Sequence, residues 1–231
     1  MFKRTVQALD LLRQIIRLPV AELHFDSSHN PAEVLATYRS YTKPHPRFKL
    51  IAHKSIGVAL IDLRRYRGCE EYIDNFKAKG QATFHAKRAK SRGYVVRPID
   101  MNCHVDDVHH INTSQLSRQG RPMPDSYLVK QCRFEPQSNY EYHGVINKDG
   151  VLVAYCSIAM YGNFAAFSQC LGYRNNDGCM QLMLTEVICN LIDSGKVHFV
   201  MFDTWFGAQA GLRQFKASFG FEPYRAIYSL L

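Results

Sequence analysis

The chain has 231 residues, of which 46% are hydrophobic and 21% are charged, a composition that is typical of a folded globular protein and excludes a disordered one. No apolar run approaches the roughly 20 residues of a membrane-spanning helix, and the N-terminal segment has no cleavage site of the secretory kind. Seven cysteines without a C-x-x-C pair suggest free thiols in a reducing compartment. We therefore expect a cytoplasmic protein, bacterial or eukaryotic.

The net charge of +9 is unevenly distributed along the chain. Residues 1–97 contain 19 Lys and Arg against 8 Asp and Glu, whereas residues 98–231 contain 10 against 12. A basic half of this kind suggests a polyanionic partner such as RNA, a nucleotide cofactor or an acidic surface. The alternative is that these side chains only make an exposed face soluble.

The first half of the chain predicts a mixture of helices and short strands. Apolar residues at helical spacing predict an amphipathic helix over 3–17, at the start of a helical extension that ends at about residue 45. Residues 51–63 are then expected to form one strand or two, and residues 66–93 a basic helical segment ended by Gly93. A strand is expected at 94–100, and a helix that leads into a loop at 105–120.

The second half has a more regular pattern. Three successive antiparallel strands are expected, with a hairpin turn at 147–150 between the first two. A long helix, a buried strand, a short helix and a last strand follow. These seven elements occupy residues 141–147, 151–161, 163–172, 177–195, 196–205, 211–220 and 223–231. We find no repeat and no linker, so the sequence predicts one domain over residues 1–231, with a mixed sheet and helices on both faces, the α/β class.

Two stretches then point to a family. FHAKRAKSRGYVVRPI, at 84–99, is a basic helix that ends in a Gly-aromatic strand. FDTWFGAQAGLRQFKASFG, at 202–220, is a strand end with Asp, a glycine-containing turn and an aromatic-Lys pair before Phe-Gly. Over about residues 60–231 the chain resembles the GNAT superfamily of acyltransferases, and within it the FemAB-type aminoacyltransferases and their acetyltransferase relatives. The resemblance implies a GNAT-like mixed central sheet and transfer of an acyl or aminoacyl group onto an amine of a small molecule or peptide.

The resemblance also bears on the acyl donor. Acetyl-coenzyme A users of this superfamily place an Arg/Gln-x-x-Gly-x-Gly/Ala loop before the long helix, where backbone N–H groups hold the pyrophosphate. The stretch LGYRNNDGCMQ has Arg174 and a single Gly178 there, and adds the negative Asp177, which is also an ordinary helix cap. FemAB-type enzymes, which use aminoacyl-tRNA, lack that loop. Aminoacyl-tRNA is therefore the expected donor and acyl-coenzyme A the alternative, with no tightly bound cofactor.

Basic residues outside this loop are candidates for donor phosphates. They are Lys87, Arg88 and Arg92 on the basic helix, together with Arg174. Lys216 matches the lysine that lies near the donor phosphates in the family. A solvated helix surface is the alternative for the first three.

The stretch SQLSRQGRPMPDSY, at 114–127, is predicted to bind an anionic part of a substrate. Arg118 and Arg121 offer planar forks of donors for a carboxylate or phosphate, and the prolines lower the entropy cost of ordering the loop. Gln119 and Tyr127 are expected to add hydrogen bonds. The alternative is a structural loop whose arginines pair with nearby aspartates, Asp106, Asp107 or Asp125.

Acyl transfer to an amine needs positioning, an oxyanion donor and a route for the proton. Asp203 and His143 are the candidate proton acceptors, and Tyr228 is a candidate proton donor to the leaving group. Asp203 is also suited to capping the turn after its strand, and His143 to a structural role.

Other classes of site find little support in the sequence. His104, His109 and His110 with Cys103 match no metal-site spacing, so we expect none. Phosphate-binding, nucleophile-elbow and dinucleotide motifs are missing.

Two further alternatives remain at the level of the whole protein. FemAB-type proteins usually contain two such domains, so a homodimer would restore the missing surface. A non-catalytic RNA-binding protein on a degenerate acyltransferase scaffold is the alternative from another class.

Overall fold

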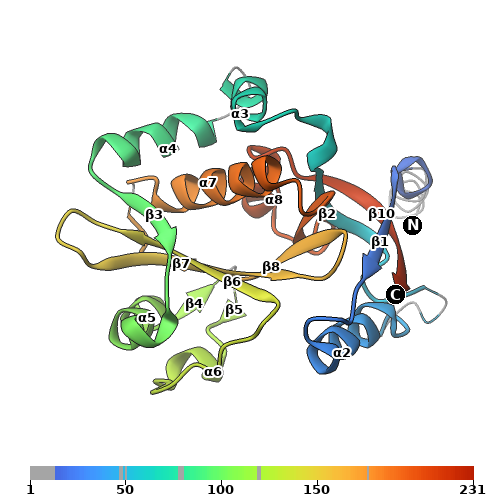
Figure 1. Ribbon diagram of the computed structural model, residues 1–231, viewed down its shortest axis with the longest axis horizontal. Helices are drawn as coiled ribbons and strands as arrows, with labels where there is room; N and C mark the ends of the chain where they lie inside the picture. Colours follow the sequence, from blue (N-terminus) through green and yellow to red (C-terminus); the bar gives the residue numbers. More distant parts are fainter. Residues whose placement is uncertain (1–13, 47–48, 50, 78–80, 119–120, 176) are drawn as a thin grey trace, which may run out of the picture.

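The computed structural model describes residues 14–46, 49, 51–77, 81–118, 121–175 and 177–231. Within these ranges an eight-stranded sheet runs through the molecule (Figure 1). Its order is β1 (Val20–Phe25), β10 (Glu222–Leu230), β2 (Ile56–Asp62), β9 (Phe199–Thr204), β8 (Phe164–Gly172), β7 (Leu152–Met160), β6 (Tyr140–Ile146) and β3 (Val95–Pro98). The pairs β1–β10 and β8–β9 are parallel and the rest antiparallel. The predicted mixed α/β sheet is confirmed.

Helices cover both faces of this sheet (Figure 1). On one side lie α3 (Cys69–Lys77), α4 (Gln81–Ser91), α7 (Cys179–Ser194) and α8 (Ala210–Ala217); on the other lie α2 (Pro31–Thr42), α5 (Val105–Thr113) and α6 (Asp125–Leu128). Short 3-10 turns occupy Leu63–Arg65 and Met101–His104, and a small hairpin joins β4 (Ser117–Arg118) to β5 (Arg121–Pro122). Because helices pack on both sides, β7 is buried along almost its whole length and reads as the continuous apolar run LVAYCSIAM.

The N-terminal region differs from the expectation of a helical extension. Residues 20–25 form β1, an edge strand parallel to β10, and only α2 is helical between there and residue 45. The strand is short, and Glu22 points to solvent, so its apolar alternation extends over too few residues to stand out. Most of the helix predicted at 3–17 lies outside the described residues.

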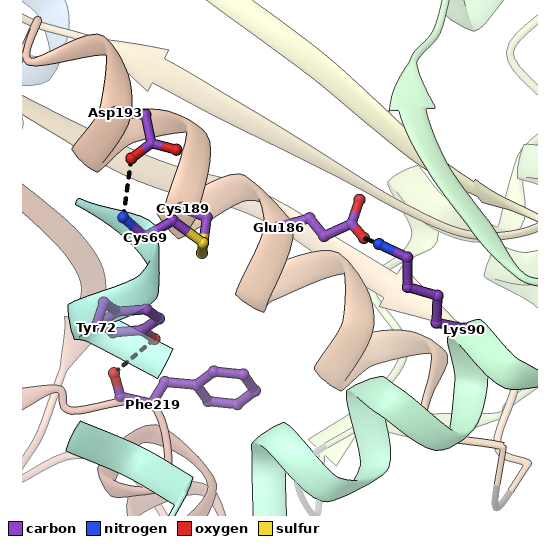
Figure 2. The surroundings of a disulfide bond; sticks show 7 residues. All are labelled: Cys69, Tyr72, Lys90, Glu186, Cys189, Asp193 and Phe219. Atoms are coloured by element: carbon purple, nitrogen blue, oxygen red, sulfur yellow. Dashed lines mark hydrogen bonds and ion pairs between the residues drawn. A yellow bond between two sulfur atoms is a disulfide. The ribbon is translucent and has the colours of Figure 1, made fainter. Parts of the chain in front are cut away.

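Two of the cysteines are paired, which corrects the expectation of free thiols. Cys69 at the start of α3 forms a disulfide with Cys189 of α7 (Figure 2). The backbone N–H of Cys69 also donates to Asp193 at 2.9 Å, and the hydroxyl of Tyr72 donates to the carbonyl oxygen of Phe219 at 2.9 Å. These contacts fasten α3 to α7 and to the turn after α8. Among the described helices, none has both the length and the apolar character needed to cross a membrane.

The turn between β7 and β8 fastens the N-terminal strand to the centre of the sheet. Gly162 forms a bridge with Phe25 at the end of β1, and the N–H of Asp26 donates to Tyr161 O at 2.6 Å. Gly162 has φ +128°, and a Cβ at this position would overlap the carbonyl oxygen of His24 and lie 3.1 Å from the nitrogen of Asp26. The close approach of two backbones therefore requires glycine here.

We predict that Gly162→Ala lowers the free energy of unfolding by about 3 kcal/mol, because it combines a left-handed φ with overlap against backbone that cannot turn away. Urea denaturation followed by circular dichroism measures the loss. Gly150→Ala is the matched control, since Gly150 has φ +82° but nothing within 4 Å of its added Cβ. Its expected cost is about 1 kcal/mol, and equal losses in the two variants would contradict the account.

Candidate active site

The two central parallel strands separate after a short contact. Only Phe164–Ala166 of β8 pairs with Phe199–Met201 of β9. Beyond that point a cavity of about 510 Å³ opens between the diverging ends. Ala166–Cys170 of β8 and Phe202 and Asp203 of β9 line it. Its other walls come from α2, the β4–β5 hairpin, α6, α8 and the start of β6, and from residues that precede β2 and α6 or follow β7. The side chains are Thr37, Ser40, Tyr41, Lys54, Arg118, Arg121, Pro122, Pro124, Tyr127, Tyr140, Tyr161, Leu212 and Lys216.

The predicted arginine loop lies on the edge of β8 that β9 leaves open. Arg118 Nη2 donates to the carbonyl oxygen of Cys170 at 2.8 Å, and Gln115 Nε2 donates to that of Gly172 at 3.4 Å. These side chains supply partners that a neighbouring strand would otherwise provide. Arg121, which pairs with Arg118 across the hairpin, is exposed at the cavity.

The structure therefore brings most of the predicted loop residues to one place. Arg118, Arg121 and Tyr127 all line the cavity, and Gln119 lies outside the described residues. The sequence also allowed ion pairs between these arginines and nearby aspartates. Arg118 instead donates its hydrogen bond to β8.

Asp203 is held in an unusual backbone conformation. Where β2 pairs with β9, Val58 lies opposite Thr204 and Leu60 lies opposite Met201. Two residues of β9, Phe202 and Asp203, therefore stand opposite a single residue of β2 and form a bulge. The φ of Asp203 is +53°, the one positive value for a non-glycine residue among those described. Such strain is maintained only where surrounding contacts fix it, and it gathers at functional sites.

Two lysines flank this carboxylate. Lys54 Nζ lies 2.8 Å from Asp203 Oδ1. Lys216 is 1% exposed; its Nζ donates to the carbonyl oxygen of Thr204 at 2.8 Å and lies 5.1 Å from the centre of the Phe202 ring. Lys216 is thus a buried lysine that reaches the cavity from α8.

The environment sets the protonation of both groups. Desolvation alone would raise the pKa of Asp203, but the charge and hydrogen bond of Lys54, with Lys216 and the Thr204 N–H, lower it below its ordinary value. The pKa of Lys216 is lowered to about 8, mainly by burial. The negative charge of Asp203 acts to raise this pKa, and the positive charge of Lys54 acts to lower it. Asp203 is therefore ionised at neutral pH, while Lys216 changes charge slightly above it.

Two tyrosines, Tyr41 and Tyr228, contact Lys54 and fix its position. Its Nζ lies 4.6 Å from the centre of the Tyr41 ring. Tyr228 donates its hydroxyl proton to the Lys54 carbonyl oxygen at 2.7 Å, and its ring packs against Tyr41 with centroids 5.6 Å apart. Tyr228, predicted to donate to a leaving group, is thus placed behind the cavity wall, where its proton is used to position Lys54.

His143, the other predicted proton acceptor, lies elsewhere. It is buried on β6 opposite Pro98 of β3, and its Nε2 is 3.5 Å from Glu141. Burial lowers its pKa, against the charge of Glu141. It does not belong to the lining of the cavity.

The start of α7 is occupied by contacts from α4 and from the residues that follow it. Arg92 forms an ion pair with Asp177, and the Tyr94 hydroxyl donates to the same carboxylate at 2.8 Å. A Cβ on Gly178, which has φ +85°, would overlap the carbonyl oxygen of His85. A negative side chain and packed backbone therefore stand where a pyrophosphate would approach this helix end.

The remaining predicted phosphate ligands are spread over other surfaces. Lys87 is exposed on α4 and Arg88 is half-buried there, on the face of the sheet that α7 covers. Arg174 lines a smaller cavity of about 210 Å³ that shares Arg118 and Phe202 with the larger one. Of the five basic residues predicted for the donor, only Lys216 lines the main cavity.

Sequence reasoning missed several residues of the site. Lys54 lies in a segment read as strand, and its partner Asp203 is distant in the sequence, so no local pattern links them. Ser168 and Gln169 did carry a signal, since they are the polar pair in the otherwise apolar strand NFAAFSQCLG. A register skip in the pairing of β7 with β8 falls beside them.

No model of a known protein family matches the chain, and no curated protein matches it in sequence. Solved structures do resemble it. FemX is 10% identical, with 86% of this chain and 67% of FemX covered at a TM-score of 0.55. The C-terminal domain of a putative lysylphosphatidylglycerol synthetase from Agrobacterium fabrum is 16% identical, with 73% and 58% covered at a TM-score of 0.49. A tandem GNAT protein from the clavulanic acid biosynthesis pathway is 18% identical, with 84% and 55% covered at 0.43.

The chain spans little more than half the length of the last two structures. At such low identity the likeness is one of fold, and FemX is the comparison on which it rests. The chain has a GNAT-like mixed sheet flanked by helices, in a fold similar to that of FemX.

Proposed function

We propose that the chain transfers an aminoacyl group from aminoacyl-tRNA to an amine of a small molecule or peptide. The observation that carries the proposal is the set Lys54, Asp203 and Lys216, gathered on one side of the cavity where β8 and β9 separate. Arg118 and Arg121 lie on the same cavity and add positive charge. The likeness of the fold to FemX supports an acyltransferase.

The chemistry assigns each charged group a role. The nitrogen of the acceptor amine attacks the carbonyl carbon of the donor ester, so a C–N bond forms and the ester C–O bond breaks. Positive charge develops on that nitrogen, and ionised Asp203 accepts its proton and returns it to the leaving oxygen. Negative charge develops on the carbonyl oxygen, which the buried cation Lys216 stabilises in a site of low dielectric.

Lys54 and the arginines hold the reactants in place. Lys54 keeps the Asp203 carboxylate oriented through their 2.8 Å contact. Arg121 has the planar fork that suits a carboxylate or phosphate, and its exposure at the cavity leaves the fork accessible to an anionic part of either substrate.

The start of α7 favours aminoacyl-tRNA over acyl-coenzyme A as the donor. Coenzyme A binding at that helix end requires free N–H groups and room for phosphate. Here Asp177 adds a negative charge next to it, and α4 packs against Gly178. The basic first half of the chain, including exposed Lys87 on α4, fits a donor that is bound mainly through its phosphates.

We predict that Asp203→Asn lowers the rate of transfer at least about 100-fold, because it removes the proton acceptor. Lys216→Met, which keeps the aliphatic volume and removes the charge, should lower it about 100-fold or more through loss of oxyanion stabilisation. The assay follows transfer of radiolabelled amino acids from mixed aminoacyl-tRNA to a panel of amines and short peptides. Lys196→Ala, an exposed lysine after α7, is the control and should keep full activity.

Donor binding separates the alternatives in the same preparation. Tight, salt-dependent binding of charged tRNA is expected, with little binding of acetyl-coenzyme A. The reverse preference would indicate a coenzyme A-dependent N-acetyltransferase. Binding of tRNA without transfer to any amine, and with equal affinity in wild type and Asp203→Asn, would indicate a non-catalytic RNA-binding protein instead.

The pKa of Lys216 predicts the pH dependence of transfer. Lys216 is a cation below about pH 8 and loses its charge as the pH rises through that value, so kcat should fall on the alkaline side with an apparent pKa near 8. The acceptor amine has the opposite effect on the rate, because it becomes more reactive as it loses its proton at higher pH. A pH profile that rises without a break to pH 9.5 would exclude Lys216 as the cation that stabilises the oxyanion.

A further inference from the structure

A second polar cluster lies in the cavity wall away from the lysines, around Glu33 in the first turn of α2. Glu33 Oε1 accepts hydrogen bonds from Thr37 Oγ1 at 2.9 Å, from the Tyr140 hydroxyl at 3.0 Å and from the Tyr161 hydroxyl at 3.2 Å. Glu33 Oε2 accepts one from the Asn139 side-chain amide at 3.2 Å. These four partners are neutral, so they orient the carboxylate and leave its charge in place.

The three hydroxyl groups connect this carboxylate to the cavity. Thr37, Tyr140 and Tyr161 all line it. Each hydroxyl has Glu33 Oε1 as an acceptor within hydrogen-bond distance, and the Tyr161 hydroxyl also lies 3.5 Å from Thr37 Oγ1 and from the Tyr140 hydroxyl. With their protons directed to Glu33, these three hydroxyl oxygens offer lone pairs that can accept hydrogen bonds from a ligand in the cavity. A group that offers several N–H donors and a positive charge is the chemical complement of such a wall.

The cavity is therefore polarised between two sides. Lys54 and Lys216 provide positive charge beside Asp203, and the Glu33 cluster provides negative charge next to α2. Tyr41 lies within electrostatic reach of both carboxylates: desolvation, then the charges of Asp203 and Glu33, raise its pKa far above its ordinary value. An aminoacyl ester has an ammonium group on the carbon next to its ester carbonyl, so it offers a partner to each of the two kinds of charge around this cavity.

We propose that Glu33, Thr37, Tyr140 and Tyr161 form a binding site for the α-ammonium group of the aminoacyl donor. The inference rests on the proposed function and adds a selection rule to it: donors with a free α-amine are used, and N-acylated donors are rejected. The acceptor amine is not the group bound here, because it must lose its proton to attack, whereas the carboxylate favours the charged form. The α-ammonium remains charged throughout the reaction.

Binding of two matched probes tests the site without any turnover. One is a 3′-aminoacylamido-adenosine, whose amide replaces the reactive ester, and the other is the same compound acetylated on its α-nitrogen. Isothermal titration calorimetry of the full chain gives both dissociation constants. Wild type should bind the free amine about tenfold or more tightly, because a charge-assisted hydrogen bond is lost on acetylation.

Variants assign the preference to the cluster. Glu33→Gln should bring the ratio of the two constants close to one, mainly by weakening the free amine, and Tyr161→Phe should lower the ratio while leaving the fold of α2 undisturbed. Glu22→Gln, at an exposed position of β1, is the matched control and should keep the wild-type ratio. Equal binding of the two probes by wild type, or no binding of either, would overturn the proposal.

Transfer assays distinguish this failure from failure of the proposed function. If wild type transfers aminoacyl and N-acetyl-aminoacyl groups from tRNA equally well, and Lys216→Met abolishes both, the acyltransferase stands and the ammonium site falls. If no transfer occurs but the probes are discriminated in a Glu33-dependent manner, the ammonium site stands and the acyltransferase falls.

Discussion

The short parallel contact between β8 and β9 is the constraint on which the rest of the site depends. The strands pair over three residues each, and then diverge. Parallel strands that separate leave N–H and C=O groups without a strand partner, and side chains or a ligand must satisfy them. Arg118 and Gln115 do so at one end of β8, which explains why a proline-rich arginine loop is seated there. The cavity is the space that remains.

The second consequence concerns charge. Lys216 extends from α8 to the opening and is buried there, and the bulge in β9 turns Asp203 toward Lys54. The bulge lies in the pairing of β9 with β2, on the opposite edge of β9 from the opening. The cost of burying Lys216 is offset by Thr204 O, the Phe202 ring and the charge of Asp203. The divergence of β8 from β9 provides the cavity, and the bulge opposite β2 provides the position of Asp203 within it.

The sequence predicted those parts of the fold that local patterns determine. Strong apolar periodicity located β6 to β8, α7, β9, α8 and β10 to within a few residues, and the order of elements identified the fold. Asp203 and Lys216 were predicted because they belong to the stretch that resembles the family, and Arg118 and Arg121 because their loop has an unusual composition. The cavity brings these four residues together.

Contacts between residues far apart in the chain could not be predicted from the sequence. Lys54 and Asp203 are distant along the chain, and the four residues of the Glu33 cluster come from α2, β6 and the turn after β7. His143 and Tyr228 were plausible by residue type, but their side chains face the interior rather than the cavity. The pairing of Cys69 with Cys189 likewise depends on the packing of α3 on α7.

The decisive experiment is a crystal structure of the chain with a 3′-aminoacylamido-adenosine bound. We expect the ligand's carbonyl group to lie between Asp203 and Lys216, in the opening between β8 and β9. A ligand bound at the start of α7, or on a surface away from this opening, would contradict it.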